Sequence, residues 1–80
     1  MNLSKAVVKR ILELCKERGI TVNALSNISG VTQSTVNDIV NGTTRNPGIV
    51  TIKKLCDGFE ITLTEFFDSP LFARLDQEIK

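Results

Sequence analysis

The sequence contains no histidine and only two cysteines among its 80 residues. Metal sites and nucleophile–base pairs are built mainly from histidine, cysteine and clustered carboxylates. No Cys, Asp and Glu residues are grouped at ligand spacing, and no glycine-rich phosphate-binding loop is present. We therefore expect no metal, no cofactor and no enzymatic activity.

Long apolar runs are also absent, and this bears on the compartment. No stretch approaches the roughly 20 apolar residues that a membrane-spanning helix needs. The first residues, MNLSKAVVKR, lack the apolar core of a secretory signal. We therefore expect a cytoplasmic protein with no membrane partner.

Cys15 and Cys56 each lie on an apolar helical stripe, which favours small reduced core residues over a redox pair.

Acidic residues are few in the first 56 residues, and basic residues are few in the last 24. Residues 1–56 carry eight Lys or Arg and three Asp or Glu, which gives a net charge of +5. Residues 57–80 carry two Lys or Arg and six Asp or Glu, which gives −4. This asymmetry favours a polyanion as the partner of the basic part, with the acidic end facing away from it.

The stretch from Ile20 to Gly42 contains two short helical patterns separated by a glycine. Thr21 and Thr32 are suitable N-terminal caps, and Gly30 and Gly42 are suitable ends. Two helices joined by a short turn that contains glycine describe a helix-turn-helix. The second helix would expose amide, hydroxyl and carboxylate groups, which can read the edges of DNA bases. These groups belong to Gln33, Ser34, Asn37 and Asp38.

Helical periodicity and caps predict three further helices. The first runs from a Ser4 cap to about Arg18, with Lys5, Lys9, Arg10 and Lys16 opposite its apolar stripe. Lys5 and Lys9 are candidates for phosphate contacts. The second runs from Ile49 to Gly58, and its apolar face includes Ile49. The third follows the capping box Thr62-Leu63-Thr64-Glu65. In the predicted helix-turn-helix between Ile20 and Gly42, Ser26 lies where the two helices must approach closely.

The last segment begins at Ser69-Pro70 and has a second apolar face. Its members recur at helical spacing: Leu71, Phe72, Leu75 and Ile79. One interpretation is a sixth helix folded onto its own domain. The other is a dimerisation arm, because a terminal amphipathic helix on a small domain often needs a partner to cover it.

The pattern resembles a known family, the phage-repressor helix-turn-helix proteins (lambda Cro/CI, or Xre-like). The likeness covers about residues 4–68, and its most specific parts are Gly19-Ile20-Thr21, Gly30 to Val36, Asn41-Gly42 and Asn46-Pro47. The resemblance implies an all-α domain of five helices, spanning residues 1–68, with an amphipathic extension at 69–80. It also implies sequence-specific binding to a palindromic operator in double-stranded DNA, usually as a homodimer, with helix 33–41 in the major groove.

Site residues follow from this resemblance. The family's base-reading positions fall on Gln33, Ser34, Asn37 and Asp38. Its backbone-contacting positions fall on Thr21, Asn23, Thr32, Thr35, Asn41, Thr43 and Arg45. These residues predict a transcriptional regulator that represses by occupying its operator. The alternative is a protein-interaction module, such as an antitoxin-like subunit, with the same fold and little direct DNA binding.

The sequence also departs from the family pattern. Many members have Gln where this chain has Val22, and the stretch from Gln33 to Asn41 contains no Lys or Arg. Because phosphate neutralisation supplies much of DNA affinity, we expect weak binding by a monomer and dependence on dimerisation. Many members also bury an Arg–Glu pair at the positions of Cys15 and Val40. Replacing both partners of a buried ion pair by apolar residues leaves no unpaired buried charge. We therefore expect the side chains of Cys15 and Val40 to be in contact.

Overall fold

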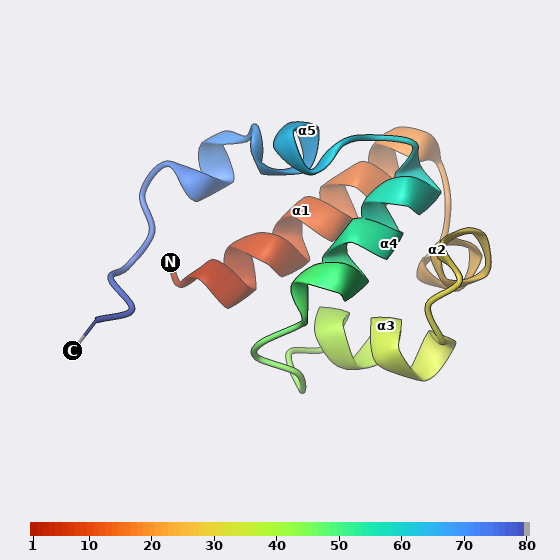
Figure 1. Cartoon of the computed structure of the whole chain (residues 1–80), viewed down its shortest axis with the longest axis horizontal. Coiled ribbons are helices and arrows are strands. Elements are labelled where there is room, and N and C mark those ends of the chain that lie inside the picture. The colour runs from red at the N-terminus through yellow and green to blue at the C-terminus, as the bar shows by residue number, and fades with distance from the viewer. Residues whose placement is uncertain (80) are drawn as a thin grey trace.

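The computed structural model describes residues 1–79, and its regular elements are all helical. In chain order they are α1 (Leu3–Arg18), α2 (Val22–Ser29), α3 (Gln33–Val40), α4 (Ile49–Phe59), α5 (Leu63–Phe67) and a single 3-10 turn, η1 (Pro70–Phe72). Figure 1 shows α1 running behind α4, with α2 at the right-hand end, α3 below α4 and α5 at the top. The expected all-α fold of five helices is confirmed. Within residues 1–79, every helix is too short or too polar to cross a membrane.

Every one of the five helices contributes to one hydrophobic core. The largest fully buried side chains are Phe66, Ile11, Leu25, Ile39, Leu55, Val36 and Cys56. Helix α2 packs against both α3 and α4, so the two helices of the helix-turn-helix are held by the rest of the domain. Short helices such as these are marginal alone in water, and tertiary packing of the apolar face supplies most of their stability.

The helix starts largely follow the predicted caps. The hydroxyl of Thr21 accepts from the Ala24 N–H at 3.0 Å, and Thr32 caps α3 in the same way through Thr35. The capping box at Thr62 and Glu65 is present. The prediction for Ser4 is wrong. The side chain of Asn2 caps α1 by accepting from the Lys5 N–H at 2.8 Å, so the helix begins before Ser4.

Helix α4 begins at Ile49 with Gly48 at its N-cap position, as predicted, but it differs from the prediction at its C-terminal end and in the exposure of Ile49. Gly58 lies inside the helix, which ends at Phe59 with Glu60 in the left-handed region. A Cβ on Gly58 would lie 3.0 Å from the Cβ of Ser29, so α2 and α4 cross where neither has a large side chain. Ser26 is also buried, as expected of a small residue between helices. Ile49, predicted to face the core, is 63% exposed.

Arg10, which the sequence pattern placed opposite the apolar stripe with three lysines, is largely covered by α5. Its Nε donates to the backbone carbonyl of Phe66 at 2.7 Å, and a terminal nitrogen donates to that of Glu65 at 2.9 Å. A second terminal nitrogen pairs with the carboxylate of Glu13. The last carbonyls of a helix have no partner within the helix. Arg10 therefore satisfies two of them in α5 and ties α5 to α1.

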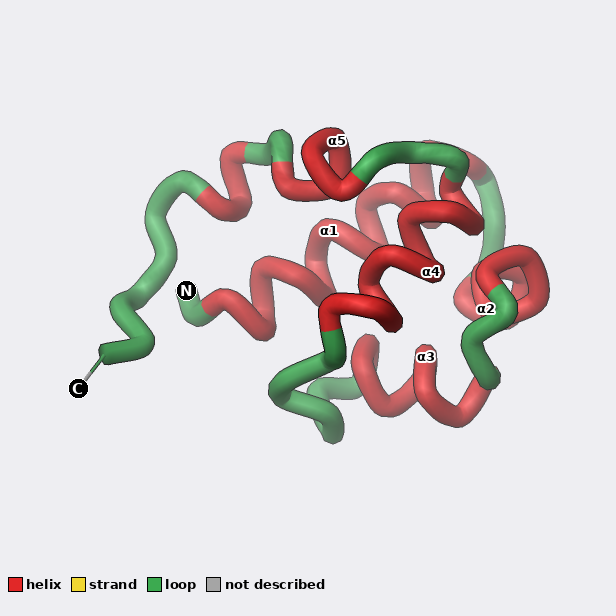
Figure 2. The backbone as a smooth tube through the Cα atoms, viewed as in Figure 1, coloured by secondary structure: helices red, strands yellow, loops and turns green. Residues whose placement is uncertain are grey.

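The predicted sixth helix does not form. After the turn at Pro70–Phe72 the described chain continues as irregular structure to residue 79 (Figure 2). The Phe72 ring packs against Phe67 at a centroid distance of 4.9 Å and lies 6.2 Å from Phe66. The backbone N–H of Asp76 donates to the carbonyl of Met1 at 3.0 Å, so it bonds a residue just before α1 and not a carbonyl of its own segment.

The structure bears on both interpretations of this segment's apolar face, which are packing on its own domain and a dimerisation arm. Leu71, Phe72 and Leu75 are half-buried within the chain itself, whereas Ile79 is 86% exposed. The four residues therefore do not form the continuous helical stripe that a dimerisation arm would present. The single-domain interpretation accounts for Phe72, which packs against the core.

Both cysteines are free and buried in the core, where the sequence predicted them. Burial raises the pKa of the Cys15 thiol and that of the Cys56 thiol, which disfavours the reactive thiolate. Cys15 lies in the core, and Val40 packs against that core from the end of α3. These positions agree with an apolar replacement of the family's ion pair, and direct contact between the two side chains stays a prediction.

The position of Arg10 predicts a stability effect. Arg10→Lys should lower the free energy of unfolding by about 1.5–3 kcal/mol, because an ammonium cannot reproduce the two-carbonyl fork of the guanidinium. Chemical denaturation measures this change. Lys9→Gln, at an exposed neighbouring position, is the matched control and should stay within about 0.5 kcal/mol. Equal stability of Arg10→Lys and the native chain would show that Arg10 does not anchor α5.

Candidate nucleic-acid interface

Helix α3 has one buried and one exposed face. Val36 and Ile39 point into the core and are 0% and 1% exposed. Gln33, Ser34 and Asp38 are exposed, and Asn37 is half-buried. The structure therefore brings the four predicted base-reading residues together on the side of α3 that faces away from the core.

The start of α2 contacts the start of α3 through side-chain amides. The Nε2 of Gln33 donates to the Oδ1 of Asn23. This bond leaves the Oε1 and the second N–H of Gln33 free, and adenine needs one acceptor and one donor for bidentate recognition. The sequence predicted Asn23 and Gln33 as separate contacts. Their pairing across ten residues has no local sequence signal, since it depends on how the two helices cross.

The capping hydroxyls restrict what the predicted backbone contacts can donate. Thr32 donates its hydroxyl hydrogen to the Oγ1 of Thr35 at 2.8 Å, so Thr32 has none left for a phosphate. Thr35 is exposed and keeps its own hydroxyl hydrogen. Thr21 is likewise exposed and only accepts in its cap. Thr21 and Thr35 are therefore the better phosphate donors of the three.

The loop after α3 is held against the end of that helix. The N–H groups of Thr43 and Thr44 donate to the carbonyl of Asp38 at 2.9 and 3.0 Å. Gly42 supplies the positive φ of 78° that the reversal requires. Asn41, Thr43 and Arg45 are all exposed on this loop and at its start. The predicted backbone contacts thus lie on both sides of α3, at the start of α2 and on the following loop.

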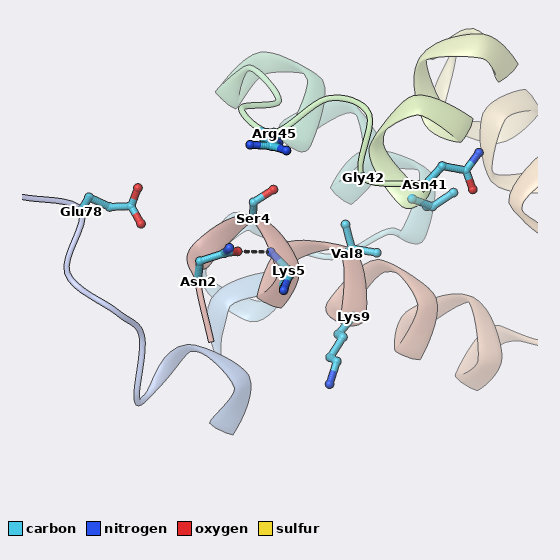
Figure 3. Close-up of a pocket in the computed structure, with 10 residues that line it drawn as sticks. Asn2, Ser4, Lys5, Val8, Lys9, Asn41, Gly42, Arg45 and Glu78 are labelled. Atoms are coloured by element: carbon cyan, nitrogen blue, oxygen red, sulfur yellow. Dashed lines mark hydrogen bonds between the residues drawn. The ribbon is translucent and has the colours of Figure 1, made fainter.

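Cationic groups lie beside α3, which itself carries none. Arg45 and Asn41 line an open cleft of about 790 Å³, and Lys5 and Lys9 line it from α1 (Figure 3). Glu78 from the C-terminal segment lines the same cleft. The expectation that the whole acidic end faces away from the basic part is therefore wrong for Glu78, because the segment turns back to the start of α1.

Comparisons with known proteins bear on this arrangement. The family model for the Cro/C1-type helix-turn-helix DNA-binding domain matches residues 10–70. The chain is 36% identical over 64 residues to the HTH-type transcriptional regulator SlrR of Bacillus subtilis (strain 168). That match covers 79% of this chain but 42% of SlrR, so the chain spans less than half of this relative's length.

A solved structure shares the fold. The crystal structure of the prophage Lp1 protein 11 superposes with a TM-score of 0.80 at 32% sequence identity, covering 94% of this chain and 100% of that one. The family is one of DNA-binding domains and not of enzymes, which confirms the expectation that the chain is not an enzyme. The resemblance predicted from the sequence is confirmed, and the chain belongs to the Cro/C1-type helix-turn-helix family of DNA-binding domains.

Proposed function

We propose that the protein is a sequence-specific transcriptional regulator that represses by binding double-stranded DNA, with α3 in the major groove. The observation that carries this proposal is the exposed polar face of α3, held outward by the burial of Val36 and Ile39 on a fold of this family. The relative SlrR is named as a transcriptional regulator. A repressor needs no catalytic group, because occupation of a promoter by the protein is sufficient to block it.

The exposed groups of α3 match particular base edges. Gln33 suits adenine, which offers an acceptor at N7 and a donor at N6. Asp38 suits the N4 amino group of cytosine. Ser34 and Asn37 can each donate and accept, so their preference depends on the neighbouring contacts. In this proposal Asn23 fixes the Gln33 amide before DNA binds.

Backbone contacts position α3 in the groove and supply the electrostatic part of affinity. Thr21, Asn23 and Thr35 would donate to phosphates on one side of α3. Asn41, Thr43 and Arg45 would do so on the other side. Arg45 is the single cation among these residues, and this scarcity implies weak binding by one copy of the chain. We therefore propose a homodimer on a palindromic operator, because two half-sites double the number of contacts.

One observation favours a second candidate function. Residues 33–41 carry one Asp and no Lys or Arg, so α3 gains nothing from phosphate attraction. A protein-interaction module with this fold needs no such attraction. Selection of bound DNA sequences, described next, decides between the regulator and the protein-interaction module.

Selection of bound sequences from a random double-stranded DNA pool at low salt tests the regulator proposal. We expect enrichment of one palindromic site, whose half-site spacing reports the geometry of the dimer. A folded protein that enriches no sequence would contradict the proposal and favour the protein-interaction module. The folded state is checked by helical circular dichroism of the same sample.

On the selected site, Gln33→Ala and Arg45→Ala should have different effects. Gln33→Ala should relax the preference at one operator position by about 1–3 kcal/mol. Arg45→Ala should weaken binding to all sequences alike and reduce the salt dependence. Binding titrations on the selected site and its single-base variants, at several salt concentrations, measure both effects. If both variants weaken all sequences equally, Gln33 does not read a base.

The Asn23–Gln33 bond predicts coupling between these two residues. Asn23→Ala should weaken the same base preference as Gln33→Ala, and the double variant should lose less than the sum, with a coupling of about 0.5–3 kcal/mol. The same titrations close this double-mutant cycle. Asn27→Ala, at an exposed asparagine one turn further along α2, is the matched control and should be additive with Gln33→Ala. Additivity of Asn23→Ala would instead refute the positioning role.

A further inference from the structure

The cleft beside α3 joins the end of the helix-turn-helix to parts of the chain that lie outside it. One wall is the first two turns of α1, and the other is the end of α3 with the loop that follows (Figure 3). In that view Arg45 lies above Ser4, with Asn41 towards one end and Glu78 at the other. The cleft is open to solvent and has a volume of about 790 Å³.

Three cations line this cleft, namely Lys5, Lys9 and Arg45. Two side-chain amides accompany them. Asn2 uses its Oδ1 in the cap of α1 and keeps its NH₂ group, and Asn41 is exposed. Cations and N–H donors suit the charged oxygens of a phosphodiester. Val8 and Val40 supply the only apolar side chains among the described residues that line the cleft.

We propose that this cleft binds a backbone phosphate of the DNA duplex, with Lys5 and Lys9 as contacts additional to Arg45. The proposal rests on the proposed DNA-binding function and extends its footprint. Asn41 and Arg45 already belong to the proposed line of backbone contacts, and the cleft continues this line to the start of α1. It also places cations next to α3, whose own residues supply none.

The same geometry gives the C-terminal segment a role in this site. Packing of Phe72 on Phe67 and the bond from the Asp76 N–H to the Met1 carbonyl bring the segment back to the start of α1. Glu78 is the one acidic side chain among the described residues that line the cleft. A carboxylate in the same cleft repels a phosphate that binds there, and in this proposal Glu78 therefore weakens the phosphate site.

The first arm of the test compares two double variants of equal charge. Lys5→Gln with Lys9→Gln removes the cleft cations, and Lys16→Gln with Lys54→Gln removes two exposed lysines that do not line the cleft. The probe is a mixed-sequence duplex of roughly 20 base pairs, with anisotropy measured between about 50 and 200 mM salt. We expect the cleft variant to bind roughly fivefold to tenfold more weakly, and its log–log salt slope to fall by about 1 for one lost phosphate. The control should change affinity by less than about twofold.

The second arm of the test removes the negative charge of Glu78. Glu78→Gln should tighten binding to the same duplex by about twofold to fivefold, whereas Glu17→Gln, an equal charge change on the exposed side of α1, should not. The gain from Glu78→Gln should disappear when Lys5 and Lys9 are also replaced by Gln. A gain of equal size in Glu78→Gln and Glu17→Gln would show a general charge effect and overturn the role of Glu78.

The outcomes separate this proposal from the proposed function. If the native chain binds the duplex and both lysine pairs behave alike, the cleft is not a phosphate site and the DNA-binding function stands. If the native chain binds neither the mixed duplex nor any selected site, the proposed function fails and the cleft proposal fails with it. Thermal unfolding of every variant, all altered at exposed side chains, verifies that the fold is unchanged.

Discussion

Val36 and Ile39 occupy the core, and the interface depends on this packing. An eight-residue helix is too short to be stable alone in water. Full burial of two such side chains contributes about 1.5–3 kcal/mol each, and the Thr32 cap adds about 1 kcal/mol. Because both apolar residues lie on one side of α3, the opposite side must face solvent. The exposed position of Gln33, Ser34 and Asp38 is therefore a consequence of how the core is filled.

The sequence predicted features that depend on neighbours in the chain. The caps at Thr21, Thr32 and Thr62 each bond a backbone group three residues away, so they can be read locally. The outward face of α3 follows from periodicity for the same reason. The errors concern distant partners. Arg10 bonds carbonyls 55 and 56 residues away, and the close approach of Ser29 leaves no room for a side chain at Gly58. No local pattern distinguishes a buried arginine fork from a solvated one.

The C-terminal segment shows why amphipathic spacing alone does not make a helix. Leu71, Phe72, Leu75 and Ile79 have helical spacing, but the rings of Phe66 and Phe67 already offer Phe72 a packing site. The Asp76 N–H then bonds Met1 instead of a carbonyl one turn earlier. A helix over these few residues would have gained few intrahelical bonds, since the first four N–H groups of any helix lack partners. Tertiary contacts therefore decide the conformation.

Helix α1 links the stability of the domain to its surface charge. Its apolar side carries Ile11 and Leu14 into the core, and Arg10 holds α5 through two carbonyls. The start of the same helix places Lys5 and Lys9 at the cleft, and Met1, which precedes the helix, accepts the bond from the Asp76 N–H. Any change that detaches the C-terminal segment from α1 also removes Glu78 from the cations. In the proposed site, the bond between Asp76 and Met1 therefore affects phosphate binding through the position of Glu78.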